Sequence, residues 1–212
     1  MTDKVLDIKL LPTIRDELTI GITDICFDLS IDHLHQQEQD ELLTGNVTER
    51  RKAELMTGRV LQKELARLNK LNPGQFYIKK DKLGKPIGYH EKAKCGVAIS
   101  HTKSMIAGAL NLKGEVGLDI EQKNRNVHKD IRNRILTAEE HDSLKTYDTI
   151  QIWTIKESIL KLLGSGLRIS MRSIQVKPID KERFQSMVSE RPILIYSYNM
   201  EKIWLTISLF DD

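Results

Sequence analysis

The feature that most constrains the fold of this 212-residue chain is the segment IQIWTIKESILKLLG, at residues 150–164. At 100° per residue, its aliphatic side chains fall within one arc, which contains Ile152, Ile155, Ile159, Leu162 and Leu163. The segment therefore predicts an amphipathic helix from about Asp148 to Leu163, which the run Gly164-Ser165-Gly166 ends.

Two charged residues, Glu157 and Lys161, project from roughly the opposite side of this helix. An exposed pair at this spacing is common on any helix and stabilises it by only about 0.2–0.5 kcal/mol, so the pair alone indicates no function. Trp153 lies one turn before Glu157 on the same stripe, where a large aromatic side chain exposed to water would bury no apolar surface. We therefore expect this stripe to face a groove.

A second acidic feature is the sequence GLDIEQ, at residues 117–122. On a strand, residues i and i+2 point to the same side, so Asp119 and Glu121 share one face. Carboxylates that close raise each other's pKa unless a cation lies between them, and with water they offer the oxygen ligands that Mg²⁺ prefers. The alternative is an edge strand whose polar face meets water, and the helix carrying Glu157 favours the metal site over it.

The first half of the chain combines strand and helix patterns. Residues 18–30 alternate apolar and small or polar side chains and predict a strand, and residues 48–71 predict a long helix that Asn72-Pro73-Gly74 stops. The segments QFYIKK and KPIGYH predict a hairpin, and CGVAIS a further strand. We also expect SMIAGALNL and EVGLDIE to pair as a hairpin around Lys113-Gly114.

The second half adds helix signals and further strands. The run TAEE, at residues 137–140, matches a capping box, in which a Thr hydroxyl and a Glu three residues later satisfy a helix start. Strands are expected near residues 172–179, 192–198 and 201–209. Long helices mixed with hairpins, without a regular alternation of strand and helix, predict an α+β fold.

Composition excludes several classes of protein. The even composition, without a Pro/Gly/Ser-rich linker, predicts one compact unit or two closely packed halves. No apolar stretch reaches the roughly 20 residues that span a bilayer, and no secretory signal pattern opens the chain, so we expect a cytoplasmic protein without membrane contact. Cys26 and Cys95 are expected to be buried, reduced thiols. The net charge of +3 suits an acidic ligand or partner but is too small to indicate DNA binding.

The run AISHTKS places Ser100 and His101 at the end of an apolar strand, where side chains leave the sheet for a loop. A lone His at a strand end is more often structural than functional. Beside Lys103, this His can also hold an anion.

Three motifs stand in register along the chain: VAISHT (97–102), GLDIE (117–121) and WTIKESILKLLGSGL (153–167). Together they resemble the 4′-phosphopantetheinyl transferases, specifically the long, surfactin-synthetase-activating type. Each motif alone is weak, but a chance match of all three in this order is improbable. GKP (84–86) and the basic helix RRKAELMTGR (50–59) resemble further elements of that family, whereas Thr102 stands where the family usually has Ser.

The resemblance implies a magnesium site and a reacting centre. Asp119, Glu121 and Glu157 match the Mg²⁺ ligands of the family. Lys161 matches the lysine that contacts the phosphates near the reacting centre. Glu157 is also a candidate to take the proton of the attacking serine, directly or through a metal-bound water.

The resemblance also implies binding positions for coenzyme A. Ser100, His101 and Lys85 match residues that bind the nucleotide and the 3′-phosphate end of the coenzyme. Arg50 falls where related enzymes carry a phosphate-binding arginine, and Arg51 and Arg59 are further candidates.

The fold implied is the α+β phosphopantetheinyl transferase fold, in which two pseudo-twofold-related halves hold the active site in the cleft between them. The halves are expected to be residues 1–112 and residues 113–212, with the metal site in the second half. The length of the chain indicates a monomer, because short relatives reach a similar arrangement by oligomerising.

The activity implied is that of a holo-[acyl-carrier-protein] synthase. It is Mg²⁺-dependent transfer of 4′-phosphopantetheine from coenzyme A to a serine of an apo acyl or peptidyl carrier protein, which releases adenosine 3′,5′-bisphosphate. Fatty-acid, polyketide and nonribosomal-peptide carriers all stay open. One alternative is a Mg²⁺-dependent nucleotide pyrophosphate hydrolase. Another is an RNA-binding module that uses Arg50, Arg51 and Lys52, although the chain has no cluster of aromatic residues to stack bases.

Overall fold

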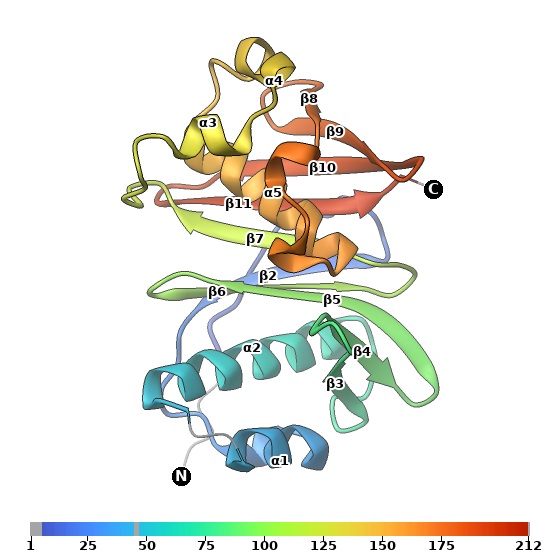
Figure 1. Cartoon of the computed structure of the whole chain (residues 1–212). Coiled ribbons are helices and arrows are strands. Elements are labelled where there is room, and N and C mark those ends of the chain that lie inside the picture. The colour runs from blue at the N-terminus through green and yellow to red at the C-terminus, as the bar shows by residue number, and fades with distance from the viewer. Residues whose placement is uncertain (1–5, 45–46, 212) are drawn as a thin grey trace. The chain divides into compact units, whose positions relative to one another are not determined.

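The computed structural model describes residues 6–44 and 47–211 of the chain (Figure 1). The chain forms two compact units, and the boundary between them lies between Gly114 and Glu115. Each unit contains an antiparallel sheet together with helices, so the expected α+β class is confirmed.

Among its described residues, the first unit has a six-stranded sheet. Its strands lie in the order β1 (Lys9–Leu10), β2 (Leu18–Asp24), β6 (Met105–Asn111), β5 (Ala93–His101), β4 (Pro86–His90) and β3 (Phe76–Lys80). The helices are η1 (Ile31–His33), α1 (Gln36–Thr44) and α2 (Glu49–Leu68). The predicted strand in 18–30, the hairpin of β3 and β4, and the strand β5 are confirmed.

Helix α2 forms where the sequence predicts it. The Thr48 hydroxyl accepts a hydrogen bond from the Arg51 backbone N–H and caps the helix start, and Asn69 stands at its end. The apolar side of the helix, which includes Met56, Leu61 and Leu65, is buried in the core of the first unit. Arg50 and Arg51, in its first turn, are exposed.

The second unit holds a five-stranded sheet within its described residues. The strand order is β7 (Gly117–Gln122), β11 (Ile203–Phe210), β10 (Arg191–Asn199), β9 (Arg183–Val188) and β8 (Val176–Pro178). The helices are α3 (Ile131–Ile135), α4 (Ala138–Ser143), α5 (Thr149–Leu163), η2 (Gly166–Arg168) and η3 (Met171–Ser173). The three predicted strand regions near the end of the chain overlap β8, β10 and β11, whereas β9 was not predicted.

Both helix signals of the second half are confirmed. Thr137 and Glu140 form the predicted capping box at the start of α4. Helix α5 begins after Asp148, whose carboxylate accepts hydrogen bonds from the backbone N–H groups of Ile150 and Gln151. It ends at Gly164, whose φ of 67° is a left-handed conformation that suits glycine.

Helix α5 packs unusually close to β7 and β11. A Cβ atom added to Gly117 would lie 1.9 Å from the carbonyl oxygen of Ser158, so only glycine fits at the start of GLDIE. Small hydroxyl side chains fill the rest of this contact: the Ser158 and Ser208 oxygens lie 2.6 Å apart and the Thr154 and Thr206 oxygens 3.0 Å apart. This close approach fixes the helix against the strand that carries the acid pair.

The predicted hairpin of SMIAGALNL with EVGLDIE is wrong. β6 pairs with β2 and β5 in the first unit, whereas β7 pairs only with β11 among the described strands. The turn Lys113-Gly114 therefore joins two different sheets. An alternating pattern identifies a strand but not its partner, and β11 lies more than 80 residues further along the chain.

Two further expectations concern the cysteines and the membrane. Cys26 and Cys95 are both free thiols, Cys95 buried and Cys26 partly buried. Among the described helices, none combines the length and the apolar character that a membrane span requires.

Candidate functional site

The acid pair and the helix acid come from neighbouring elements of the second unit. Gly117 contacts α5, so the alternation of side chains along β7 places Asp119 and Glu121 on the side of the sheet that faces this helix. Ile152, Ile155, Ile159 and Leu162 of the predicted aliphatic arc of α5 are buried, and its last member, Leu163, is partly buried. Trp153, Glu157 and Lys161 stay partly exposed. The predicted shared face of the acid pair and the predicted polar stripe of the helix are both confirmed.

A short ion pair links the strand to the helix. The Lys161 ammonium nitrogen lies 2.6 Å from Oδ1 of Asp119. The Asp119 side chain is 6% exposed and that of Lys161 is 33% exposed. The carboxylate is therefore nearly buried, while its partner reaches the site from the solvent side.

A second cation, Arg125, approaches the cluster from the turn after β7. Its guanidinium forms an ion pair with Glu121, and its central carbon lies 5.0 Å from the centre of the Trp153 ring. Sequence reasoning missed this residue because it belongs to none of the three motifs. Its position four residues after Glu121 was a possible signal, but that spacing predicts contact only within a helix.

The three carboxylates influence one another electrostatically. Burial is the main cause that raises the pKa of Glu157, and the nearby charge of Asp119 raises it further. Burial likewise raises the pKa of Glu121, with additional contributions from Asp119 and Glu157. Lys161 and Arg125 oppose both shifts. Coupling of this kind requires the three acids to lie near one another, so strand and helix contribute to one anionic cluster.

The donors of this cluster fit a hard divalent cation in chemistry, although they are not arranged as a finished cage. Within residues 6–44 and 47–211, no three His, Cys, Asp or Glu side chains stand in a ready metal-binding arrangement. Ammonium and guanidinium groups instead pair with the carboxylates of Asp119 and Glu121. Carboxylate oxygens are the ligands that Mg²⁺ prefers, so a metal at this site has to compete with these cations for them.

A different lysine of α5, Lys156, is part of the interior. Its ammonium lies 2.6 Å from Oε2 of Glu140 and donates to the carbonyl groups of Ile135, Met171 and Ile174. Burial lowers the pKa of Lys156, and the Glu140 carboxylate opposes this shift. Lys156 thus fixes α5 against α3, α4 and η3, next to Glu157 in the chain.

The first unit contains a small cavity of about 160 Å³ with a basic rim. Arg51, Arg59, Lys80 and His101 line it, together with the carboxylate of Glu54. Arg51 lies 3.1 Å from Glu54 and 3.3 Å from Nε2 of His101. Because a guanidinium only donates, this nitrogen of His101 acts as the acceptor. Three cations and one imidazole around one acid suit an anionic ligand.

The remaining candidates for coenzyme binding, Arg50, Lys85 and Ser100, are not among the residues that line this cavity. Arg50 pairs with Glu54 and donates to the Lys103 carbonyl, beside the cavity. Lys85 directly precedes Pro86, which lines the cavity. Ser100 is buried on β5, on the opposite face from Ile99 and His101 because neighbouring strand residues alternate. Sequence reasoning had not selected Lys80 or Glu54.

Arg59 is held by a buried acid from a helix that was not predicted. Glu38 of α1 is 2% exposed, and its carboxylate oxygens lie 3.7 Å from Arg59 and 3.5 Å from Lys63. The same carboxylate accepts the backbone N–H groups of His35 and Ile78. The wall of the cavity is therefore joined to α1 and β3.

The hydroxyl of Thr102, the departure from the family pattern, is used. Its oxygen accepts hydrogen bonds from the backbone N–H groups of Ser104 and Met105 in the tight turn between β5 and β6. This turn follows His101 directly, so the Thr side chain helps to fix the strand end.

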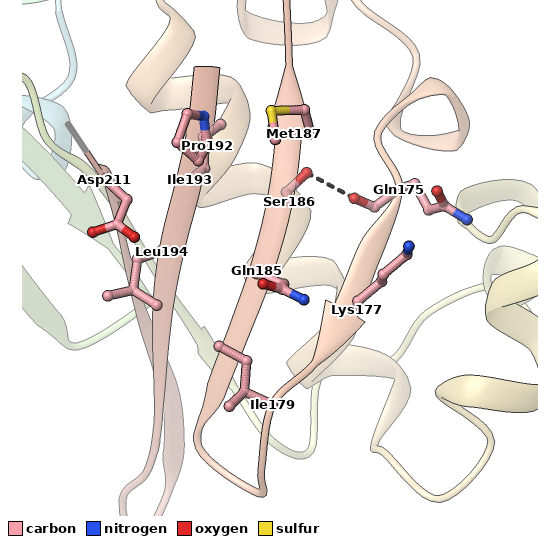
Figure 2. A pocket seen from close by; sticks show the side chains of 10 residues that line it. All are labelled: Gln175, Lys177, Ile179, Gln185, Ser186, Met187, Pro192, Ile193, Leu194 and Asp211. Atoms are coloured by element: carbon pink, nitrogen blue, oxygen red, sulfur yellow. Dashed lines mark hydrogen bonds between the residues drawn. The ribbon is translucent and has the colours of Figure 1, made fainter. Parts of the chain in front are cut away.

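A larger groove of about 310 Å³ lies over β8, β9 and β10 (Figure 2). Its lining mixes apolar side chains such as Met187 and Leu194 with Lys177 and Asp211. Ser186 donates to the Gln175 carbonyl at one side of it, over 2.7 Å. β7 lies at the other edge of the sheet order, so this groove is not part of the acidic cluster.

Comparison with known proteins bears on the second unit. Residues 115–202 match the family model of the 4′-phosphopantetheinyl transferase superfamily. The match includes the acidic strand and helix α5 and leaves residues 203–212 and the first unit outside. No curated protein matches the chain. The family match supports the resemblance seen in the motifs, and with it phosphopantetheine transfer in general.

Proposed function

We propose that this protein transfers the 4′-phosphopantetheine group of coenzyme A to a serine hydroxyl of an apo acyl or peptidyl carrier protein. The observation that carries the proposal is the cluster of Asp119, Glu121 and Glu157 beside Lys161. These residues lie within the part of the chain that matches the superfamily. The main difficulty of the reaction is the high negative charge of the coenzyme's pyrophosphate. A cluster of this composition can bring positive charge to it, through a bound cation and through Lys161.

The three carboxylates would hold a magnesium ion through their oxygens. When bound, this ion supplies positive charge that neutralises the pyrophosphate of the coenzyme. Lys161 contributes a further positive charge at the position where negative charge builds up in the transition state. Its pairing with Asp119 keeps the ammonium at the cluster.

The transfer itself exchanges one phosphorus–oxygen bond for another. The serine oxygen bonds to the phosphorus of the phosphopantetheinyl group as the bond to the adenosine bisphosphate oxygen breaks. Glu157 takes the serine proton, directly or through a water.

The first unit supplies a basic cavity suited to a phosphate group. Arg51, Arg59, Lys80 and His101 line it, so we propose these side chains, together with Arg50 and Lys85, for the anionic nucleotide end of the coenzyme. Ser100 belongs to the same proposal through the family motif alone. The net charge of +3 suits a carrier protein that is acidic around its serine, because opposite charge steers association.

Intact-mass analysis tests the proposal. The purified protein is incubated with coenzyme A, Mg²⁺ and apo carriers from fatty-acid, polyketide and nonribosomal-peptide systems. We expect at least one carrier to gain the mass of phosphopantetheine, and this gain to require Mg²⁺. Glu139→Gln, which changes an exposed glutamate of α4, serves as the control that keeps the activity. Coenzyme cleavage without any carrier would indicate a pyrophosphate hydrolase, and retention of RNA without cleavage would indicate a binding module.

A further inference from the structure

The cluster of acids is neutralised by two cations of the chain itself. Lys161 pairs with Asp119 from helix α5, and Arg125 pairs with Glu121 from the turn after β7. Both cations lower the raised pKa values of Glu121 and Glu157. A divalent ion that uses these carboxylates therefore has to compete with side chains that already hold them.

We propose that Arg125 is a displaceable counterion of the metal site, which pairs with Glu121 in the metal-free protein and releases it when a divalent ion binds. This inference rests on the proposed function, because it assumes that the acidic cluster takes such an ion. Arg125 is then a positioning residue, since it acts on the metal through Glu121. It sets the affinity of the site and keeps the paired acids from repelling each other before the ion arrives.

The geometry selects Arg125 rather than Lys161 as the cation that moves. The Arg125 side chain is 38% exposed and its partner Glu121 is 20% exposed, so their pair is the more open of the two to solvent. Lys161 instead reaches a carboxylate that is 6% exposed. A solvent-exposed ion pair gains little net energy and exchanges readily, whereas a partly buried one holds its geometry.

Trp153 gives the guanidinium a second contact that it can keep after it leaves Glu121. The central carbon of Arg125 lies 5.0 Å from the centre of the Trp153 ring, within the range of a cation–π contact. The backbone N–H of Arg125 donates to the Gln122 carbonyl, which holds the start of the residue in the turn after β7. The side chain can thus leave Glu121 and stay beside the indole. This arrangement also explains why a large aromatic residue occupies the polar stripe of α5.

Binding of Mn²⁺ alone, measured by electron paramagnetic resonance, tests the inference through a double-mutant cycle. Arg125→Met is expected to tighten Mn²⁺ binding about two- to fivefold, the size of one exposed ion pair. In the Glu121→Gln background the same Arg125→Met change is expected to have no effect, because the pair is already absent. Arg134→Met, which removes an exposed arginine of α3, is the matched control for a general change of charge.

An equal gain from Arg125→Met in both backgrounds would overturn the inference, because it would show a general effect of charge rather than competition for Glu121. No gain in either background would overturn it as well. Failure of the proposed function gives a different result: Arg125→Met then still tightens Mn²⁺ binding, while no carrier gains mass.

Tryptophan fluorescence gives a second, independent measurement. The chain has two Trp residues, so Trp204→Phe leaves Trp153 as the only reporter. Saturation with Mg²⁺ is expected to change the Trp153 emission in this variant, and the change should vanish when Arg125→Met is added. Emission that stays the same in the presence of Arg125 would contradict displacement.

Discussion

Helix α5 carries two lysine–carboxylate pairs of equal length and opposite character. Lys156 lies 2.6 Å from Glu140 and Lys161 lies 2.6 Å from Asp119. Lys156 and Glu140 are 0% and 1% exposed, whereas Lys161 is 33% exposed. The distance between the charged atoms therefore does not distinguish a structural pair from a functional one.

The difference lies in what surrounds each pair. Lys156 also donates to three backbone carbonyls, and Glu140 also accepts from Thr137 and Val176, so every element around this pair depends on it. Asp119 instead lies among two further acids whose pKa values it raises. A closed pair fixes the helix, and an open pair among like charges lies where a ligand can reach it.

The largest effect on stability is expected from breaking the closed pair. Lys156→Met leaves the Glu140 charge buried without its cation, which we expect to lower the free energy of unfolding by about 3–5 kcal/mol. Urea denaturation measures this loss. Adding Glu140→Gln should recover part of it, and a loss below about 1 kcal/mol for Lys156→Met would show that the two pairs do not differ as described.

Breaking the open pair is expected to affect the reaction instead. Lys161→Met removes positive charge from the reacting centre and should lower kcat about 100- to 1,000-fold. The free energy of unfolding should fall by less than in Lys156→Met, because the Lys161 side of this pair is open to water. Carrier mass gain over time and urea denaturation measure the two quantities. A variant that unfolds as readily as Lys156→Met would remove the distinction.

The close contact between β7 and α5 can be tested at Gly117. Gly117→Ala places a Cβ against the Ser158 carbonyl and forces α5 away from β7, at a cost of about 1–3 kcal/mol. The shift also moves Glu157 and Lys161 relative to Asp119, so activity should fall by more than the stability loss alone explains. Activity and unfolding measured on the same sample separate these effects, and an unchanged enzyme would mean that the approach is not needed.

The smallest effect is expected from the pH dependence of stability. The pKa of Glu157 in the folded protein is raised, so its contribution to stability is complete below the ordinary pKa of about 4.5 and is lost as pH rises through the raised value. Glu157→Gln should therefore stabilise the metal-free protein at neutral pH, by less than about 1 kcal/mol, and leave it unaffected at pH 4. Thermal unfolding across this range checks the sign, and a destabilised variant at neutral pH would reverse it.

Much of the candidate site could be predicted because its signals are local. The periodicity of residues 150–164 identifies α5 and its polar stripe, and strand alternation places Asp119 and Glu121 on one face. The capping box at Thr137 and the glycine at 164 mark helix ends through bonds within a few residues. Each of these features depends on neighbours in the sequence.

The features that were missed depend on distant partners. β7 pairs with β11 rather than with β6, because the partner of a strand is decided by burial across the whole sheet. Arg125, in a turn, contacts Trp153, on a helix, although the two residues are 28 positions apart in the sequence. The sequence alone does not distinguish Lys156 from an exposed helix lysine, because its partner Glu140 lies on another helix. Helix α1 was not predicted because its polar sequence shows no clear apolar face.

The most direct test of the account is the number of Mn²⁺ ions that the wild-type protein binds, and their affinity, compared with Asp119→Asn, Glu121→Gln and Glu157→Gln. The account predicts one ion per chain and a clear loss of affinity in all three variants, with the exposed Glu139→Gln unchanged. An affinity that falls in Asp119→Asn but stays at the wild-type value in Glu157→Gln would contradict it, because strand and helix would then not share one ion.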